Sequence, residues 1–211
     1  MTQEERRSQM RERIIAAACH EFGSRSYEAA SVNRICQQGE FSKGVLYHYY
    51  SSKDALFLGC VDHSFQRMTG YCREHLPDSA PVTWETVLYY FQCRHDFFLA
   101  YPDLQGVVSL ALTNPPAHLA EEVTRLKQPF DQLNYQLLDG YLNVRKKVAG
   151  IPLADMLALM EFYQSYCNSC SQMREAAAQG IEACEELRKT YLDAFLHGVI
   201  RDSDSSAQPA D

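Results

Sequence analysis

The chain has 211 residues, and its 20 Lys and Arg against 27 Asp and Glu give a formal net charge of −7. Hydrophobic residues make up 46% and charged residues 22%, a balance typical of a folded globular protein, so a disordered chain is excluded. The length allows one large domain or two small ones. The net acidity argues against a general nucleic-acid coat protein.

The sequence favours a cytoplasmic protein without membrane contact. The longest charge-free stretch, 104–120, contains Asn114-Pro115-Pro116 and falls short of the roughly 18 apolar residues of a membrane span. The first residues, MTQEERRSQMRERI, are highly charged and lack the apolar core of a signal peptide. In that compartment we expect the eight cysteines to be mostly reduced.

The N-terminal part of the chain shows helical periodicity. Ile14, Ala18 and Phe22 recur every four residues, which predicts a helix over 4–23 with one apolar stripe. Gly23 is then expected to end this helix as a C-terminal glycine.

Two short helices and one long helix are expected next. Ser31 and Ser42 are typical N-cap residues, and the turn 39–41 separates the two short helices that they begin. The tetrapeptide 51–54 (SSKD) has capping-box spacing, with Asp in place of the usual Glu or Gln, and opens a helix over 53–75.

The remaining chain is also expected to be helical. Proline and glycine positions divide it into helices over 83–98, 102–113, 117–149 with a break at Pro129, 153–179 and 181–199. No strand-like alternation of useful length appears, so the predicted fold class is all-α, with about nine helices. The polar tail, 201–211, is expected to be disordered.

Residues 31–50 form a candidate helix-turn-helix, because two short helices joined by a tight turn follow a packing helix. Apolar side chains suited to lock the two helices together are Val32, Ile35, Cys36, Phe41, Leu46 and Tyr50. Small and polar residues remain for the outer face of the second helix, whose N-terminal end could enter the major groove of DNA.

The segment 13–58 resembles the DNA-binding domain of the TetR (tetracycline-repressor-like) transcriptional regulators. The resemblance is carried by Ile14, Ala18, Phe22, Ser31, Val32, Ile35, Phe41-Ser42-Lys43-Gly44, Leu46-Tyr47-His48-Tyr49-Tyr50, Ser52-Lys53 and Leu56. It implies a three-helix DNA-binding domain over 1–52 and a larger helical domain for effector binding and dimerisation over 53–200. Charge supports a division, since 1–60 holds eight basic and seven acidic residues and 61–211 holds 12 and 20.

The resemblance also implies roles at the DNA. The expected DNA-contacting residues are Ser31, Ser42, Lys43, Gly44, Val45, Tyr47, His48, Tyr49 and Lys53. Lys43 and His48 correspond to contacts of the recognition helix, and Lys53 corresponds to a lysine that meets the DNA backbone. The alternatives left open are that Tyr47 and Tyr49 only pack and that Lys53 is a solvated surface lysine.

Two positions depart from the family pattern. Glu40 stands where such proteins often have glycine in the turn, with Gly39 one residue earlier. Because a positive φ is costly for a residue with a side chain, we expect Gly39 to absorb the bend. Cys36 stands where a small Ala is common, which is a modest change in volume.

The last two expected helices carry apolar residues on more than one face, so one face should meet a partner. The resemblance implies a homodimer through a four-helix bundle of 153–179 and 181–199 from each subunit. The expected interface residues are Met156, Met160, Cys167, Leu187, Tyr191 and Phe195. Cys167 and Cys170 fit packing cysteines better than a redox pair or a metal site, and neither a metal nor a cofactor is expected.

In TetR regulators, the helices that correspond to 53–75, 83–98 and 102–149 enclose a small-molecule effector. The expected pocket residues are Phe65, Met68, Trp84, Phe91, Phe98, Tyr135 and Tyr163, each of which could instead belong to the core. Such a lining suits a mostly apolar effector, aromatic or cationic, of unknown identity.

The sequence therefore predicts a homodimeric repressor that an effector releases from a palindromic double-stranded DNA operator. One alternative is a helical protein-interaction module that no longer binds DNA, against which Lys43, Tyr47, His48 and Lys53 together argue. An enzyme is the other alternative, and no nucleophile–base pair, Gly-rich phosphate loop or paired carboxylates support it.

Overall fold

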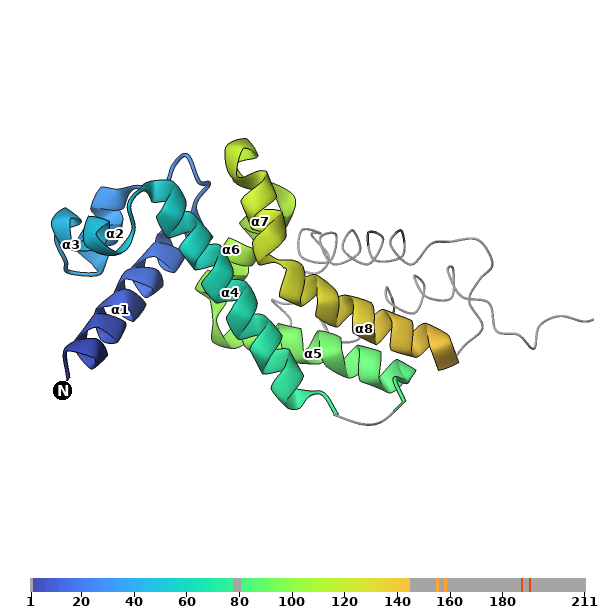
Figure 1. Ribbon diagram of the computed structural model, residues 1–211. Helices are drawn as coiled ribbons and strands as arrows, with labels where there is room; N and C mark the ends of the chain where they lie inside the picture. The colour runs from blue at the N-terminus through green and yellow to red at the C-terminus, as the bar shows by residue number, and fades with distance from the viewer. Residues whose placement is uncertain are drawn as a thin grey trace, which may run out of the picture. The chain divides into compact units, whose positions relative to one another are not determined.

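The computed structural model describes residues 2–77 and 81–144, together with positions 155, 158, 187 and 190. Over these residues the chain forms eight α-helices, one short 3-10 helix and no strand, which confirms the predicted all-α class (Figure 1). The elements are α1 (Gln3–Ser24), α2 (Val32–Gln38), α3 (Lys43–Tyr49), α4 (Lys53–His75), α5 (Trp84–Ala100), α6 (Pro102–Thr113), η1 (Ala117–Leu119), α7 (Ala120–Leu126) and α8 (Gln128–Val144). None of the described helices combines the length and the hydropathy needed to cross a membrane.

The chain divides into two compact units. The first comprises Met1–Glu74 and Arg94–Asp131, and the second comprises His75–Cys93 and Gln132–Asp211. The first unit therefore contains α1 to α4 together with α6, η1 and α7. The domain boundary between residues 52 and 53 stays a prediction.

The core of the first unit is built on the apolar stripe of α1. Ile14, Ala18 and Phe22 are fully buried, as their spacing predicts. They belong to one cluster with Ile35 of α2 and Leu46 of α3, so the three N-terminal helices share a core. The same cluster extends through the buried residues of α4, α6 and α7.

Helices α1 and α6 approach one another at two glycines. A Cβ on Gly23 would lie 2.4 Å from the carbonyl oxygen of Asp103, and one on Gly106 would lie 2.1 Å from the carbonyl oxygen of Gly23. The prediction that Gly23 ends α1 is therefore wrong, since the helix continues to Ser24 and Arg25 is extended. The glycine is needed for the close backbone approach instead of for a left-handed cap.

The described part of the second unit pairs the beginning of α5 with α8. The Tyr90 hydroxyl donates a hydrogen bond to Oδ1 of Asn134, and both side chains are buried. Buried Val87 and Leu137 add apolar surface from the two helices. Helix α8 begins directly after α7 with Pro129 in its first turn, so the break expected at this proline is confirmed.

Candidate nucleic-acid interface

The helix-turn-helix forms where the sequence predicts it. The hydroxyl of Ser42 accepts a hydrogen bond from the backbone N–H of Val45 at 3.2 Å, which confirms the N-cap of α3. Leu46 is fully buried and anchors α3 to the core. The exposed side of α3 and its cap brings together Ser42, Lys43, Gly44, Tyr47 and His48, while Val45 and Tyr49 are half-buried. Tyr47 is 47% exposed, so it is not part of the core.

The turn between α2 and α3 corrects the sequence-based expectation. Gly39 has φ −81°, whereas Glu40 has φ 53° and is the only described non-glycine residue with a positive φ. The N–H of Phe41 donates to Cys36 O at 3.1 Å and that of Glu40 donates to Gln37 O at 3.2 Å, the pattern of a Schellman motif. Glu40 therefore occupies the left-handed position that favours glycine, at a cost of about 1–2 kcal/mol.

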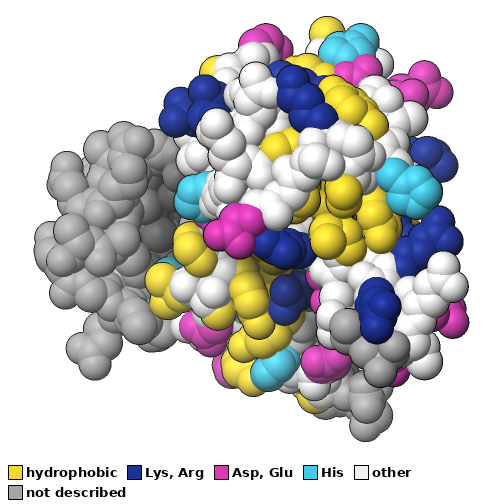
Figure 2. Space-filling view, turned by 90° about the vertical axis from the view of Figure 1, so that its left-hand side faces the viewer, with side chains coloured by type: hydrophobic (Ala, Val, Ile, Leu, Met, Phe, Trp, Pro, Cys, Tyr) yellow, Lys and Arg dark blue, Asp and Glu magenta, His cyan; other side chains and the backbone are white. Residues whose placement is uncertain are grey.

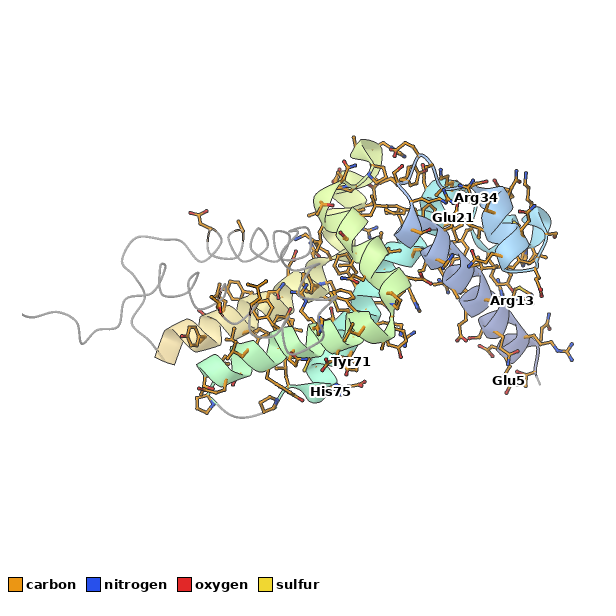
Figure 3. All side chains as sticks on the ribbon, turned by 180° about the vertical axis from the view of Figure 1, so that it is seen from behind. Glu5, Arg13, Glu21, Arg34, Tyr71 and His75 are labelled. Atoms are coloured by element: carbon orange, nitrogen blue, oxygen red, sulfur yellow. The ribbon has the colours of Figure 1, made fainter. Side chains whose placement is uncertain are left out.

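A buried carboxylate supports the beginning of α2. Glu21 of α1 is only 4% exposed, and its Oε1 accepts from the backbone N–H of Ser31 at 2.9 Å and from Arg34 Nε at 2.7 Å. Figure 3 shows Glu21 and Arg34 side by side. Burial acts to raise the pKa of Glu21, but the hydrogen bonds from Arg34 and Ser31 and the charges of Arg34 and Arg25 outweigh burial and lower this pKa.

The predicted N-cap position of Ser31 is confirmed, but its side chain makes no capping hydrogen bond. Glu21 takes over the capping role from a distant part of the sequence. The backbone N–H of Ser31, one of the expected DNA-contacting residues, is thus already engaged within the protein.

The N-terminus of α4 is capped by Ser52, whose hydroxyl accepts from the backbone N–H of Ala55 at 3.0 Å. The predicted capping box between Ser51 and Asp54 is therefore wrong by one residue. Asp54 is engaged elsewhere, because it accepts a hydrogen bond from the Tyr27 hydroxyl and lies 3.4 Å from Nε2 of His118. The bond from Tyr27 is the largest cause that lowers the pKa of Asp54.

Lys53 lies beside the group formed by Tyr27, Asp54 and His118. Its Nζ donates to the carbonyl oxygen of Glu28 at 3.5 Å and lies 4.5 Å from the centroid of the Tyr27 ring. Burial raises the pKa of the Tyr27 phenol, and the hydrogen bond to Asp54 raises it further, so the ring stays neutral under the lysine. One long hydrogen bond leaves the ammonium group of Lys53 with donors for another partner.

The sequence interpretation missed basic residues of α1. Two grooves of about 830 and 920 Å³ run between the N-terminal part of α1 and helix α3, and His48 and Tyr49 at the end of α3 line both of them. Arg7 also lines both grooves, while Arg6 lines one and Arg11 the other. Figure 2 faces the side on which α1, α2 and α3 lie in Figure 1, where Lys, Arg and His side chains are interspersed with hydrophobic and acidic ones.

Arg11 is held in place within this surface. Its Nε donates to the hydroxyl of Tyr50 at 3.3 Å, and this hydrogen bond is the largest cause that raises the pKa of Arg11. Arg7 and Arg11 are four residues apart, so they share one face of α1. That spacing, next to a helix-turn-helix, is the signal by which the sequence could have identified them.

The expected effector residues fall in different parts of the fold. Phe65, Met68 and Phe98 are buried in the first unit, and Phe65 packs against Phe130 at a centroid distance of 5.5 Å. In the second unit Phe91 is buried, while Tyr135 is 42% exposed. The side chain of Trp84 and all of Tyr163 lie outside the described residues. The two grooves are lined by other residues, so the effector pocket stays a prediction.

The expected dimer interface falls mostly on the part of the chain that the structure leaves undescribed. Leu187 is helical and half-buried, whereas Met156, Met160, Cys167, Tyr191 and Phe195 lie outside the described residues, as does Cys170. Within the described ranges, no group of three or more His, Cys, Asp or Glu side chains could hold a metal ion.

Comparisons with known proteins point to one family. The family model described as "Bacterial regulatory proteins, tetR family" matches residues 14–60. A curated relative from Bacillus subtilis, the uncharacterized HTH-type transcriptional regulator YuxN, is 30% identical over 154 residues, which is 70% of this chain. The matched region spans 50% of that relative, so the chain covers about half of its length.

Solved structures share the fold. The regulator FadR from Bacillus subtilis, solved in complex with stearoyl-CoA, has a TM-score of 0.73 and 14% identity, over 89% of this chain and 98% of that one. A TetR family regulator from Chloroflexus aurantiacus has a TM-score of 0.65 and 19% identity, over 92% and 94%. Reduced NemR from E. coli has a TM-score of 0.64 and 16% identity, over 95% and 100%.

Proposed function

We propose that this chain, which belongs to the tetR family of bacterial regulatory proteins, is a DNA-binding transcriptional regulator. In this proposal it acts as a homodimeric repressor that a small-molecule effector releases from a palindromic operator. The observation that carries the proposal is α3, which Leu46 anchors in the core while Lys43, Tyr47 and His48 face solvent.

The residues around α3 fit the two surfaces of a duplex. The major groove is about 12 Å wide and admits an α-helix, and phosphates flank that helix on both sides. Gly44 at the N-terminal end of α3 leaves space for a close approach to base edges, where Lys43 and His48 are the candidate base contacts. Arg7 and Arg11 beside α3, and Lys53 at the beginning of α4, are the cations that we assign to phosphates.

The dimer and the effector complete the proposed mechanism. Two-fold symmetry through 153–179 and 181–199 would present two recognition helices to half-sites about 34–36 Å apart. An effector changes operator affinity only if it binds the DNA-bound and free states differently, and such couplings are typically about 1–3 kcal/mol. Because FadR from Bacillus subtilis was solved with stearoyl-CoA, a long-chain acyl-CoA, which joins an apolar chain to a charged head, is the first effector to test.

Selection of bound fragments from random duplex DNA by the full chain tests the proposal. We expect a palindromic sequence to be enriched by the original protein and lost with a Lys43→Ala, His48→Ala double variant. Both side chains are exposed, so the melting temperature of this variant should be unchanged. If the original protein enriches no sequence, the proposal is wrong and the alternative of a protein-interaction module is favoured.

A further inference from the structure

Two positions of the α2–α3 turn, 39 and 40, favour glycine, and only residue 39 is a glycine. A Cβ on Gly39 would lie 2.0 Å from Cε1 of Phe41, so the ring of Phe41 packs where only glycine leaves room. Phe41 is partly buried against the core of the first unit, which makes this packing part of the fold. The left-handed position then falls on Glu40, where φ is 53°.

Arg13 of α1 contacts this turn from outside the motif. Its Nη2 donates to Glu40 Oε2 at 3.1 Å and, in a longer contact, to the backbone carbonyl oxygen of Glu40 at 3.5 Å. The neighbouring residue, Ile14, is fully buried, so the backbone that carries Arg13 is fixed in the core. One guanidinium thus ties both the side chain and the main chain of the left-handed residue to a rigid helix.

We propose that Arg13 is a positioning residue that holds the α2–α3 turn in its left-handed conformation and thereby sets the orientation of α3. The contact compensates for the absence of glycine at residue 40, where the left-handed conformation favours glycine. As far as it concerns DNA, the inference rests on the proposed function, because only then does the orientation of α3 matter for binding.

The packing of α3 explains why a surface contact has this effect. Of the seven residues of α3, only Leu46 is buried, while Val45 and Tyr49 pack half-buried against the core, so this short helix has few core contacts to fix its orientation. The turn before α3 and the Tyr50 cap after it determine the remaining orientation. Arg13 and Glu40 are 46% and 82% exposed, so their ion pair is screened and its effect is expected to be modest.

A double-mutant cycle in thermal unfolding tests the inference without DNA. Arg13→Ala should lower the melting temperature by roughly 1–4 °C, since the left-handed residue loses its restraint. Glu40→Gly should raise the melting temperature, and Arg13→Ala should change little when added to Glu40→Gly. Equal losses from Arg13→Ala in both backgrounds would overturn the inference.

Binding to the selected duplex gives the second measurement. Arg13→Ala should weaken binding about two- to fivefold with an unchanged salt dependence, and Glu40→Gly should restore the affinity of the double variant to within about twofold. If Arg13 instead touched a phosphate, Arg13→Ala would remove one phosphate contact from each of the two subunits and reduce the magnitude of the salt slope by about 1.8, and Glu40→Gly would not rescue it. That result would overturn the positioning role and leave the DNA-binding function intact.

Arg73→Ala is the matched control, because Arg73 is an exposed arginine near the far end of α4. It should leave both the melting temperature and the affinity unchanged in either background at residue 40. Failure of the original protein to bind any duplex would contradict the proposed function, while the unfolding cycle would still decide the role of Arg13.

Discussion

The α1–α6 crossing and the α2–α3 turn place different demands on the backbone. At the crossing, a Cβ on Gly106 would lie 2.1 Å from the Gly23 carbonyl oxygen, so sterics exclude any side chain. At the turn, φ 53° at Glu40 only disfavours a side chain, and Arg13 can hold the residue there. Glycine is therefore obligatory where backbones touch and replaceable where only a conformation is needed.

Gly106→Ala should have the largest effect, because the added methyl group meets backbone that cannot rotate away. We expect a loss of about 3 kcal/mol in the free energy of unfolding, at the upper end of the usual cost of overpacking. Urea unfolding of the full chain measures it. Gly70→Ala in α4 is the control, since no atom lies within 4 Å of the new Cβ and helix propensity should stabilise it by up to about 1 kcal/mol. Equal stability of the two variants would contradict the claim that steric overlap between α1 and α6 excludes a side chain at Gly106.

Glu21→Gln tests the support under α2, which depends on charge instead of shape. The variant keeps the volume of the side chain but replaces the carboxylate that accepts a hydrogen bond from Arg34 by a neutral amide. We therefore expect the free energy of unfolding to fall by about 1–3 kcal/mol at pH 7. Because the folded pKa of Glu21 lies below its ordinary value of 4.5, its stabilisation is present above that pH. It is lost as the pH falls through the folded pKa.

The free energy of unfolding, measured from neutral to acid pH, tests whether the charged form of Glu21 stabilises the fold. Glu21→Gln should flatten the fall in stability below about pH 4.5, because the variant has no carboxylate to protonate at this position. An acid limb as steep as that of the original protein would assign the effect to other carboxylates.

Gly44→Ala separates the stability of α3 from its proposed contact with DNA and has the smallest expected effect on folding. A Cβ there would meet only Ser42 Oγ, at 3.7 Å, so helix propensity should raise the free energy of unfolding by about 0.5–1 kcal/mol. The same methyl group should weaken binding to the selected duplex, because it stands where α3 approaches the bases. A stabilised variant with undiminished affinity would move the base contacts away from Gly44.

Local signals in the sequence predicted local structure well. The four-residue spacing of Ile14, Ala18 and Phe22 predicted a buried stripe, and Ser42 predicted the cap of α3, because each depends on residues within one or two turns. The all-α class followed from the same periodicity along the chain.

Features set by distant residues were not readable in this way. Gly23 looks in the sequence like the end of a helix, but in the structure it allows the close approach of Asp103 and Gly106 of α6. Ser31 has the residue type of a side-chain cap, but its own N–H is bound by Glu21, ten residues earlier in the chain. Glu40 is an unfavourable residue for a left-handed turn, but Arg13 of α1 binds it there. The grooves beside α3 likewise depend on how α1 packs, so the spacing of Arg7 and Arg11 puts them on one face of α1 but does not show that this face lies beside α3.

The salt dependence of duplex binding tests most directly whether α1, α3 and α4 form a DNA-binding face. Arg7→Ala and Lys53→Ala should each weaken binding to all sequences alike and reduce the magnitude of the slope of log K against log salt by about 1.8, because each removes one phosphate contact from each of the two subunits. Arg73→Ala should change neither quantity. Affinities and slopes that stay at the original values in both Arg7→Ala and Lys53→Ala would contradict this placement of the DNA.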